Sequence, residues 1–348
     1  MTTIVFVRIN YQSPDPTMLR ILEKSNDMIS RIKVNIQLTK AITRFPLTSL
    51  IVSTILLILL SLSIAPATSN ALGLVNQSID LRDIETKKIR VDDIEMAYKM
   101  FGNGPAILLI NGYSAPLDFW DPLLINKLAS NHTLITFDNR GIGNTSSGSK
   151  EFSIPQFAQD TVGLMEALKI DKADILGWSM GGMVAQELTI SNPDKVNKLI
   201  IYASICGGND SVPPKNEAIN TFSNQTENTT KRLEKFLPLL FPEQWRIENP
   251  NLIQSLPRST EISTIETLDL QMKAITTWEG TCNRLNSITN PTMVLVGTDD
   301  VLTVPENSML IASKITGSWL IQIEGGGHAV MMQYPEKVSS IIDLFLTS

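Results

Sequence analysis

The sequence predicts an α/β fold: a mostly parallel, doubly wound sheet with a helical insertion, preceded by an N-terminal hydrophobic segment. From residue 86 onward, short apolar runs of strand length alternate with segments of helical periodicity, as expected for parallel strands covered by helices on both faces. The alternation stops after Cys206 and resumes at Thr292. One strand-to-helix turn has the form Gly-x-Ser-x-Gly, centred on Ser179.

The composition is that of a globular protein. The chain has 348 residues, of which 43% are hydrophobic and 18% charged, and its formal net charge is −6. This length is sufficient for one large domain or two small ones. Proteins that bind nucleic acids usually carry a basic surplus, which this chain lacks, so we expect no nucleic-acid partner.

The N-terminal part differs from the remainder in charge. Residues 1–65 contain seven Lys or Arg and three Asp or Glu, a net charge of +4, whereas the remaining residues contain 22 basic and 32 acidic side chains, a net charge of −10. The uncharged stretch 47–65 is about as long as a bilayer-spanning helix. We therefore expect a basic N-terminal segment (1–45), a signal peptide or membrane anchor (46–66) and a linker (67–85).

The apolar stretch predicts export. The basic residues lie on its N-terminal side, which favours a cytoplasmic N-terminus and an exported C-terminal part. Small residues follow it, so cleavage near Ala67 or Ala71 would give a secreted protein. The long basic region before it favours the alternative, an uncleaved anchor that makes the membrane a partner and holds the protein outside the cytoplasm. A helix buried in the core is a third interpretation.

The first part of the predicted core spans 86–206. The wholly apolar run Ala106–Ile110 predicts a strand buried on both faces, and Ser153 with Gln156 forms a capping box that begins a helix. The predicted strands are Lys87–Val91, Ile94–Met100, Ala106–Ile110, His132–Phe137, the run before Ser179 and Lys198–Ala203. The predicted helices are Leu117–Leu128, the capped helix to about Lys169 and one that ends near Ser191.

The second half contains the insertion and the end of the core. Residues 207–285 begin as a polar loop and continue with helical patterns near Lys231–Leu240 and Glu261–Thr277. The core resumes over 286–348. Its predicted elements are the strands Thr292–Gly297 and Ser318–Ile323 and the helices Glu306–Ile315 and Pro335–Leu346. Cys206 and Cys282 are the only cysteines, and their spacing alone does not establish a disulfide.

The turn at Ser179 predicts a nucleophile. An apolar run leads into it and a helical pattern follows, so the serine lies at the apex of a sharp turn that requires small neighbours. Gly177 and Gly181 meet that requirement, and Gly182 allows close helix packing. The hydroxyl is then exposed at the edge of the sheet, and the amides of the following helix point toward its target. An ordinary strand–helix turn is the alternative.

A serine nucleophile needs a base, and the chain contains two histidines. His132 opens a predicted strand, at the end of the sheet away from Ser179. His328 follows the last strand in a loop with three glycines, on the same edge as Ser179. We therefore predict that His328 is the base, the alternative being a surface histidine in a loop.

The base in turn needs a carboxylate to orient it. Asp299 and Asp300 follow the strand that ends at Gly297, again on that edge, and we prefer Asp300. The order Ser–Asp–His along the chain matches the order expected on a doubly wound sheet. Either aspartate could instead be an exposed turn residue or a helix cap.

The oxyanion formed during the reaction needs two preorganised amides. One is the amide of Met180, which follows the nucleophile. The other should come from the turn after Ile110, where we select Tyr113, because Gly112 leaves room for the backbone. A plain strand–helix turn is the alternative.

Five motifs in order resemble the α/β-hydrolase superfamily, over residues 86–348 with only the insertion unplaced. They are Pro105-x-x-x-Leu109-Ile110-Asn111-Gly112, Asp138-x-Arg140-Gly141-x-Gly143, Gly177-Trp178-Ser179-Met180-Gly181-Gly182, Gly297-Thr298-Asp299-Asp300 and Gly326-Gly327-His328. The resemblance implies Ser179 as nucleophile, Asp300 as acid, His328 as base, a helical cap over the pocket and a structural role for the loop 138–143. The serine motif is most similar to that of esterases, enol-lactonases, monoacylglycerol lipases and cofactor-free haloperoxidases. The chain has Asn111 where the family usually has histidine, so the hydrogen bonding of that turn is expected to differ.

These predictions combine into a serine hydrolase that cleaves a small-molecule ester, thioester or lactone through an acyl-enzyme. We expect no cofactor and no metal, and a substrate pocket that includes Trp178 and Tyr113. A non-catalytic surface receptor for a ligand, built on a hydrolase scaffold, is one alternative. Cleavage of a C–C bond or perhydrolysis by the same three residues is another.

Overall fold

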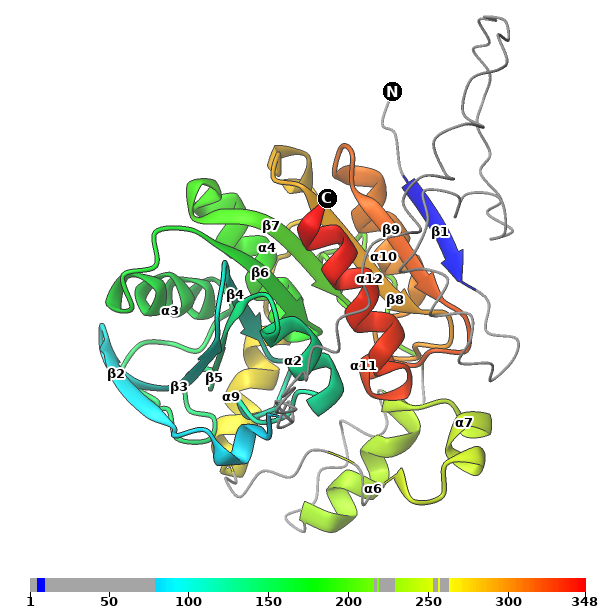
Figure 1. Cartoon of the computed structure of the whole chain (residues 1–348), viewed down its shortest axis with the longest axis horizontal. Coiled ribbons are helices and arrows are strands. Elements are labelled where there is room, and N and C mark those ends of the chain that lie inside the picture. Colours follow the sequence, from blue (N-terminus) through cyan, green and yellow to red (C-terminus); the bar gives the residue numbers. More distant parts are fainter. Residues whose placement is uncertain (1–4, 10–78, 216–217, 219–228, 253–255, 257–262) are drawn as a thin grey trace, which may run out of the picture.

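The computed structural model describes residues 5–9, 79–215, 218, 229–252, 256 and 263–348 (Figure 1). The predicted membrane segment 46–66 and all but the last residues of the linker 67–85 lie outside these ranges. Among the helices in the described ranges, none is both long and apolar enough to cross a membrane.

Within the described residues, a nine-stranded sheet forms the centre of the molecule (Figure 1). The strands are β1 (Val5–Ile9), β2 (Lys87–Val91), β3 (Ile94–Gly102), β4 (Ala106–Ile110), β5 (Thr133–Phe137), β6 (Ala173–Trp178), β7 (Val196–Tyr202), β8 (Thr292–Gly297) and β9 (Trp319–Ile323). Their spatial order is β1-β9-β8-β7-β6-β4-β5-β3-β2. The pairs β2–β3 and β3–β5 are antiparallel and the others parallel, which confirms the mostly parallel sheet.

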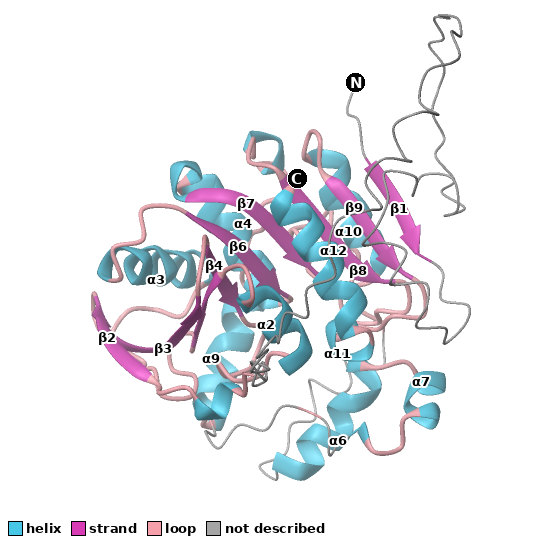
Figure 2. Ribbon diagram, viewed as in Figure 1, coloured by secondary structure: helices cyan, strands magenta, loops and turns pink. Residues whose placement is uncertain are grey.

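Helices cover both faces of this sheet (Figure 2). The helices are α2 (Pro122–Ala129), α3 (Ile154–Ala167), α4 (Met180–Ser191), α6 (Thr229–Leu240), α7 (Glu243–Glu248), α9 (Ile265–Thr276), α10 (Pro305–Lys314), α11 (Val330–Gln333) and α12 (Pro335–Thr347), with short 3₁₀ turns η2 (Leu81–Asp83), η3 (Pro193–Lys195) and η4 (Leu285–Ser287). Side chains of α3, α4 and α10 belong to one hydrophobic cluster, and those of α2 and α12 to a second.

Strand β4 shows why a central strand can be apolar throughout. Leu108 and Ile110 belong to the cluster beneath α3 and α4, whereas Ile107 and Leu109 belong to the cluster beneath α2 and α12. All four side chains are fully buried. Successive strand residues point to opposite faces, so a strand covered on both sides can carry no polar side chain at these positions without a partner.

Local capping sets the ends of the helices. The Ser153 side chain accepts a hydrogen bond from the Gln156 amide at 3.2 Å, so Ser153 caps α3 as predicted. The Gln156 side chain, the second member of the predicted capping box, donates to Asp160 at 2.9 Å. The predicted start of the preceding helix at Leu117 is wrong. Asp121 caps that helix by accepting the amides of the next turn, with Pro122 at its first position, and α2 therefore begins five residues later.

The edge strand β1 lies in the segment expected to be only a basic N-terminal region. It pairs in parallel with β9, with Val7 opposite Ile321. Sequence patterns missed it because five residues are too few to distinguish a strand from other short apolar runs.

The segment between β7 and β8 contains α6, α7 and α9, and its two ends are joined. Cys206, after β7, forms a disulfide with Cys282, a pairing that the sequence left open. The Thr281 amide also donates to the Cys206 carbonyl oxygen at 2.6 Å, and Arg284 pairs with Glu187 of α4 at 2.6 Å. The insertion is therefore attached to the core by covalent and polar contacts at its base.

Candidate active site

The turn between β6 and α4 consists of Ser179 alone. Its φ of 58° and ψ of −119° lie in a region that residues other than glycine rarely adopt. A Cβ added at Gly177 would lie 2.2 Å from the Gly181 carbonyl oxygen, and one at Gly181 would lie 2.0 Å from the Ile110 carbonyl oxygen. Both glycines are therefore required by the close approach of backbone around the serine.

The turn after β4 lies beside this serine. A Cβ added at Gly112 would be 3.1 Å from the Ser179 Cβ and 3.6 Å from its Oγ. Tyr113 follows in that turn, and Met180 is the first residue of α4, where an amide has no carbonyl partner within its own helix. The two amides selected from the sequence thus belong to segments that flank Ser179, and their role as oxyanion donors stays a prediction.

Asp300 and His328 are brought together at the carboxyl ends of β8 and β9. These strands are parallel neighbours with Gly297 opposite Ile323, so the loops that follow them leave the same edge of the sheet. The His328 Nδ1 atom lies 2.9 Å from the Asp300 Oδ2 atom, and both side chains are almost completely buried. This is the contact that the sequence predicted between these two residues.

The Asp300 carboxylate is held by further donors. It accepts the amides of Leu302 at 2.8 Å and Thr303 at 3.0 Å, and the Thr303 hydroxyl at 2.7 Å. Burial raises the pKa of this carboxyl, but the charge and hydrogen bond of His328 and the two bonds from Thr303 outweigh it, so the pKa lies below its usual value. Asp299 is exposed and accepts the Thr298 hydroxyl, which distinguishes it from Asp300, the aspartate preferred from the sequence.

The backbone of His328 is fixed from the strands beneath it. Its carbonyl oxygen accepts a hydrogen bond from Trp178 Nε1 at 3.2 Å and from the Tyr202 hydroxyl at 3.0 Å. The Tyr202 hydroxyl also accepts the Met331 amide at 3.1 Å, and burial raises its pKa. The rings of Trp178 and His328 are 5.7 Å apart, so the histidine lies on the same edge of the sheet as Ser179, the residue after Trp178.

Trp178 is only 4% exposed and its ring also stacks on Phe119 and Tyr202. Its contacts therefore hold the histidine loop, and its predicted place in a substrate pocket stays a prediction. Sequence reasoning missed Tyr202. Its phenol ends the otherwise aliphatic run Leu199–Ile201 at the carboxyl edge of the sheet, and this position was the available signal.

Asn111, which replaces the histidine usual in the resembling family, shapes the turn after β4. It is fully buried, and its Nδ2 donates to the Pro116 carbonyl oxygen at 2.8 Å. The backbone carbonyl oxygen of Asn111 accepts Asn139 Nδ2 at 3.3 Å. The Asn111 side chain thus ties the turn to its own continuation, and its backbone ties the turn to the neighbouring loop 138–143.

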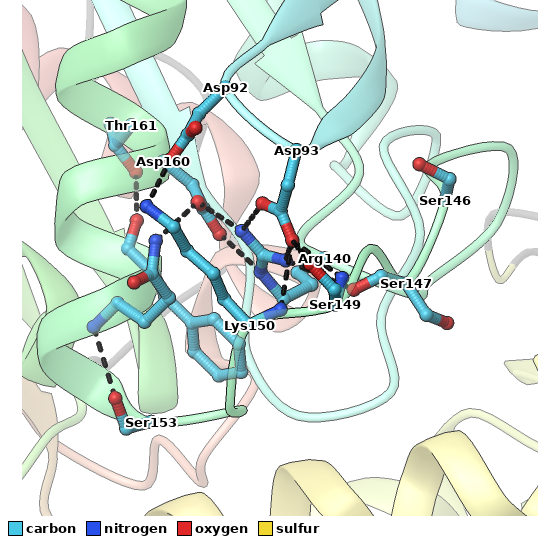
Figure 3. A network of polar contacts seen from close by, with 12 residues as sticks. Asp92, Asp93, Arg140, Ser146, Ser147, Ser149, Lys150, Ser153, Asp160 and Thr161 are labelled. Carbon is cyan, nitrogen blue, oxygen red and sulfur yellow. Dashed lines mark hydrogen bonds and ion pairs between the residues drawn. The ribbon is translucent and has the colours of Figure 1, made fainter.

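Arg140, in the loop 138–143, lies within a network of polar contacts that joins this loop to neighbouring segments (Figure 3). The fully buried Arg140 guanidinium binds Asp93 and Asp160, each with two hydrogen bonds of 2.7 to 2.9 Å. These bonds raise the pKa of Arg140 against the opposing effect of its burial, and the pKa of Asp93 is lowered mainly by its bond to Arg140. Asp138 accepts the Leu117 amide at 2.7 Å.

His132 lies outside the site. It is buried just before β5, and its Nδ1 atom is 3.2 Å from the Leu128 carbonyl oxygen. Within the described ranges, no group of three or more His, Cys, Asp or Glu side chains could hold a metal ion.

Comparison with known proteins identifies the family of this chain. Residues 105–335 match the family model described as the alpha/beta hydrolase fold. The chain belongs to this family. It is an enzyme of the hydrolase type.

Relatives and solved structures are similar over most of their length. The chain is 26% identical over 281 residues to the putative non-heme bromoperoxidase BpoC of Mycobacterium tuberculosis, covering 73% of this chain and 98% of that protein. It is 25% identical over 275 residues to the human serine hydrolase BPHL, covering 76% and 87%. An alpha/beta hydrolase fold protein from Chitinophaga pinensis superposes with a TM-score of 0.66 at 25% identity, covering 78% of this chain and all of that one.

Proposed function

We propose that this α/β-hydrolase cleaves a small-molecule carboxylic ester, thioester or lactone through an acyl-enzyme on Ser179. The observation that carries the proposal is the 2.9 Å bond between His328 and Asp300 at the edge of the sheet where Ser179 stands at its strained turn. A buried carboxylate bound to Nδ1 leaves Nε2 as the ring nitrogen that accepts a proton. The name of the human relative, a serine hydrolase, supports the same assignment.

In the proposed reaction, the Ser179 oxygen attacks the substrate carbonyl carbon as His328 Nε2 takes the hydroxyl proton. The amides of Tyr113 and Met180 bind the oxyanion. The bond to the leaving alcohol or thiol breaks, and His328 gives it the proton. Water then attacks the acyl-enzyme, loses a proton to His328, and releases the acid, after which the proton returns to the Ser179 oxygen. Asp300 stays ionised and orients the imidazole throughout.

Labelling with a fluorophosphonate tests the nucleophile. Wild-type protein should be labelled on Ser179, and Ser179→Ala should lose the label and lower kcat for an aryl acetate on the order of 10⁶-fold. Ser308→Ala is the matched control, because Ser308 on α10 is buried and its hydroxyl has no partner among the described residues. Label that survives Ser179→Ala refutes the proposal.

The same assay separates an enzyme from a receptor. A receptor would turn over little aryl acetate and would show no fall on His328→Ala. If the protein is the proposed serine hydrolase, the wild type should turn over aryl acetate and His328→Ala should abolish that turnover.

A second reaction is supported by the name of the bacterial relative, a putative non-heme bromoperoxidase. Hydrogen peroxide would replace water in attacking the acyl-enzyme, giving a peracid instead of the acid. Measuring peracid formation from an ester and hydrogen peroxide tests this reaction, and it should depend on Ser179 as hydrolysis does.

A further inference from the structure

A glutamine of the insertion reaches the turn beside the nucleophile. Gln271 lies on α9, on the face that also buries Leu268 and Ala274. Its Oε1 accepts a hydrogen bond from the Ser114 amide at 2.9 Å, across 157 positions of the chain. An N–H group can bond only to the oxygen of a carboxamide, so this contact also fixes which way the Gln271 amide points.

The position of α9 is set independently of this bond. A Cβ added at Gly141, in the loop after β5, would lie 2.8 Å from the Thr267 methyl, so the start of the helix packs closely on that loop. Beyond its end, Trp278 Nε1 donates to Glu187 of α4 at 2.8 Å, and the disulfide of Cys282 follows. The helix is thus a fixed support from which Gln271 can hold the turn.

The turn that Gln271 contacts is strained. Ser114 has a φ of 61°, in the left-handed region of backbone conformation that residues other than glycine and asparagine seldom adopt. The cost of this conformation and the strength of one hydrogen bond are of the same order. The bond to Gln271 is therefore strong enough to offset this cost, alongside the bond of Asn111 to the Pro116 carbonyl oxygen in the same turn.

The NH₂ group of the Gln271 side chain indicates that stability alone does not explain why a glutamine occupies this position. The side chain is fully buried, and its Nε2 has no hydrogen-bond partner among the described residues. A buried donor without a partner destabilises the fold, and an apolar side chain of similar shape would avoid that cost. The contribution of this glutamine is thus the acceptor that it presents to Ser114.

We infer that Gln271 is a positioning residue for the proposed reaction, through its carbonyl oxygen on the Ser114 amide. This inference rests on the proposed function of Tyr113, whose amide precedes Ser114 in the same turn. With the Ser114 peptide held, the Tyr113 amide keeps its direction toward the oxyanion beside Ser179. When the acceptor is removed, the Ser114 amide turns to find another partner and the oxyanion donor moves with it. The insertion thereby contributes a positioning contact to the proposed site.

Gln271→Met tests the inference, because it keeps the size of the side chain and removes both the acceptor and the unpartnered donor. We expect kcat for an aryl ester to fall about tenfold, a transition-state loss of about 1.4 kcal/mol, with little change in KM. The midpoint of urea unfolding should stay the same or rise. A purely structural role would lower the midpoint and leave kcat in place. Leu268→Met, on the same buried face of α9, is the matched control and should change neither.

Hydrogen exchange supplies a readout that does not depend on activity. The Ser114 amide should exchange slowly in the wild type and in Gln271→Glu, which keeps an oxygen acceptor, and faster in Gln271→Met. Unchanged exchange or unchanged kcat in Gln271→Met overturns the inference, as does a fall in kcat shared by Leu268→Met. Absence of turnover and of Ser179 labelling in the wild type would instead refute the proposed function, while exchange would still decide whether Gln271 holds the turn.

Discussion

The Asp300 side chain shows how a single residue can be distinguished from its neighbour. Its carboxylate is buried with three donors from residues 302–303 and a fourth from His328, whereas the Asp299 side chain is exposed. A buried carboxylate without these bonds would be protonated or displaced. The donors keep it ionised at the Nδ1 atom of His328, and this sets the tautomer of the ring.

Asp300→Asn should impair the reaction without unfolding the protein. The amide can present its NH₂ group to Nδ1, which moves the ring proton to Nε2 and removes the base. We expect kcat for an aryl acetate to fall on the order of 10³- to 10⁴-fold. Asp299→Asn makes the same carboxylate-to-amide change at the exposed neighbouring residue and should keep wild-type activity. Equal losses in the two variants would contradict the role of Asp300.

The lowered pKa of Asp300 predicts how stability responds to acid. The folded-state pKa lies below the ordinary 3.8, so the unfolded chain binds this proton first as the pH falls. The stabilisation is therefore complete above that ordinary value and is lost as the pH falls through the lower pKa of the folded state. Urea unfolding of wild type and Asp300→Asn should show a difference in free energy at neutral pH that shrinks only below about pH 4. If the difference in unfolding free energy between the two proteins is the same at pH 3 and pH 7, the lowered pKa of Asp300 is contradicted.

Most of the proposed site could be predicted at this scale because its residues follow from local rules. Ser179 lies between two glycines, and His328 is the one of two histidines at the correct edge. The supporting bonds of Tyr202 and Gln271 could not be predicted. They join residues 126 and 157 positions apart and depend on how the elements pack.

Among the helices and strands, the buried strands of the sheet were the most predictable. The bounds of β8 agree with the predicted Thr292–Gly297, since turn residues flank this apolar run on both sides and its length favours a strand over a helix. The six-residue α7 and four-residue α11 were missed because such short helices carry too little periodicity. The mode of attachment of the insertion also needed the structure, since two cysteines at a separation of 76 do not reveal their pairing.

Removing the disulfide should destabilise the protein and spare its activity. Cys206→Ala with Cys282→Ala frees a long loop in the unfolded chain, which costs about 2–4 kcal/mol of folding free energy. The bonds of Thr281 to Cys206 and of Arg284 to Glu187 still hold the base of the insertion in the folded state. Thermal melting with and without dithiothreitol gives the measurement. Reductant should lower the wild-type midpoint toward that of the double variant and leave the variant unchanged.

At the scale of the whole molecule, pairing of β1 with β9 and export through the segment 46–66 exclude each other. β1 precedes the apolar segment 46–66, and its partner β9 lies in the hydrolase domain after that segment. If this segment crosses a bilayer, as we propose from its composition, the two strands lie on opposite sides and cannot pair. Cleavage near Ala67 or Ala71 would remove β1 altogether. Either form of export therefore requires a domain that is stable with β9 at its edge.

A chain that begins at residue 72 should accordingly fold and retain the activity of the full chain. Among the residues whose burial is described, the buried members of the two hydrophobic clusters begin at Leu81 and Val91, and β1 is joined to β9 by a parallel ladder. Its removal exposes one strand edge, which favours association more than unfolding. The kcat/KM for an aryl acetate and the thermal midpoint of the truncated and full chains provide the comparison, with dilution to detect association. A truncated chain that is monomeric yet inactive or unfolded would show that β1 is an integral part of the hydrolase domain, and export by either route would then be incompatible with function.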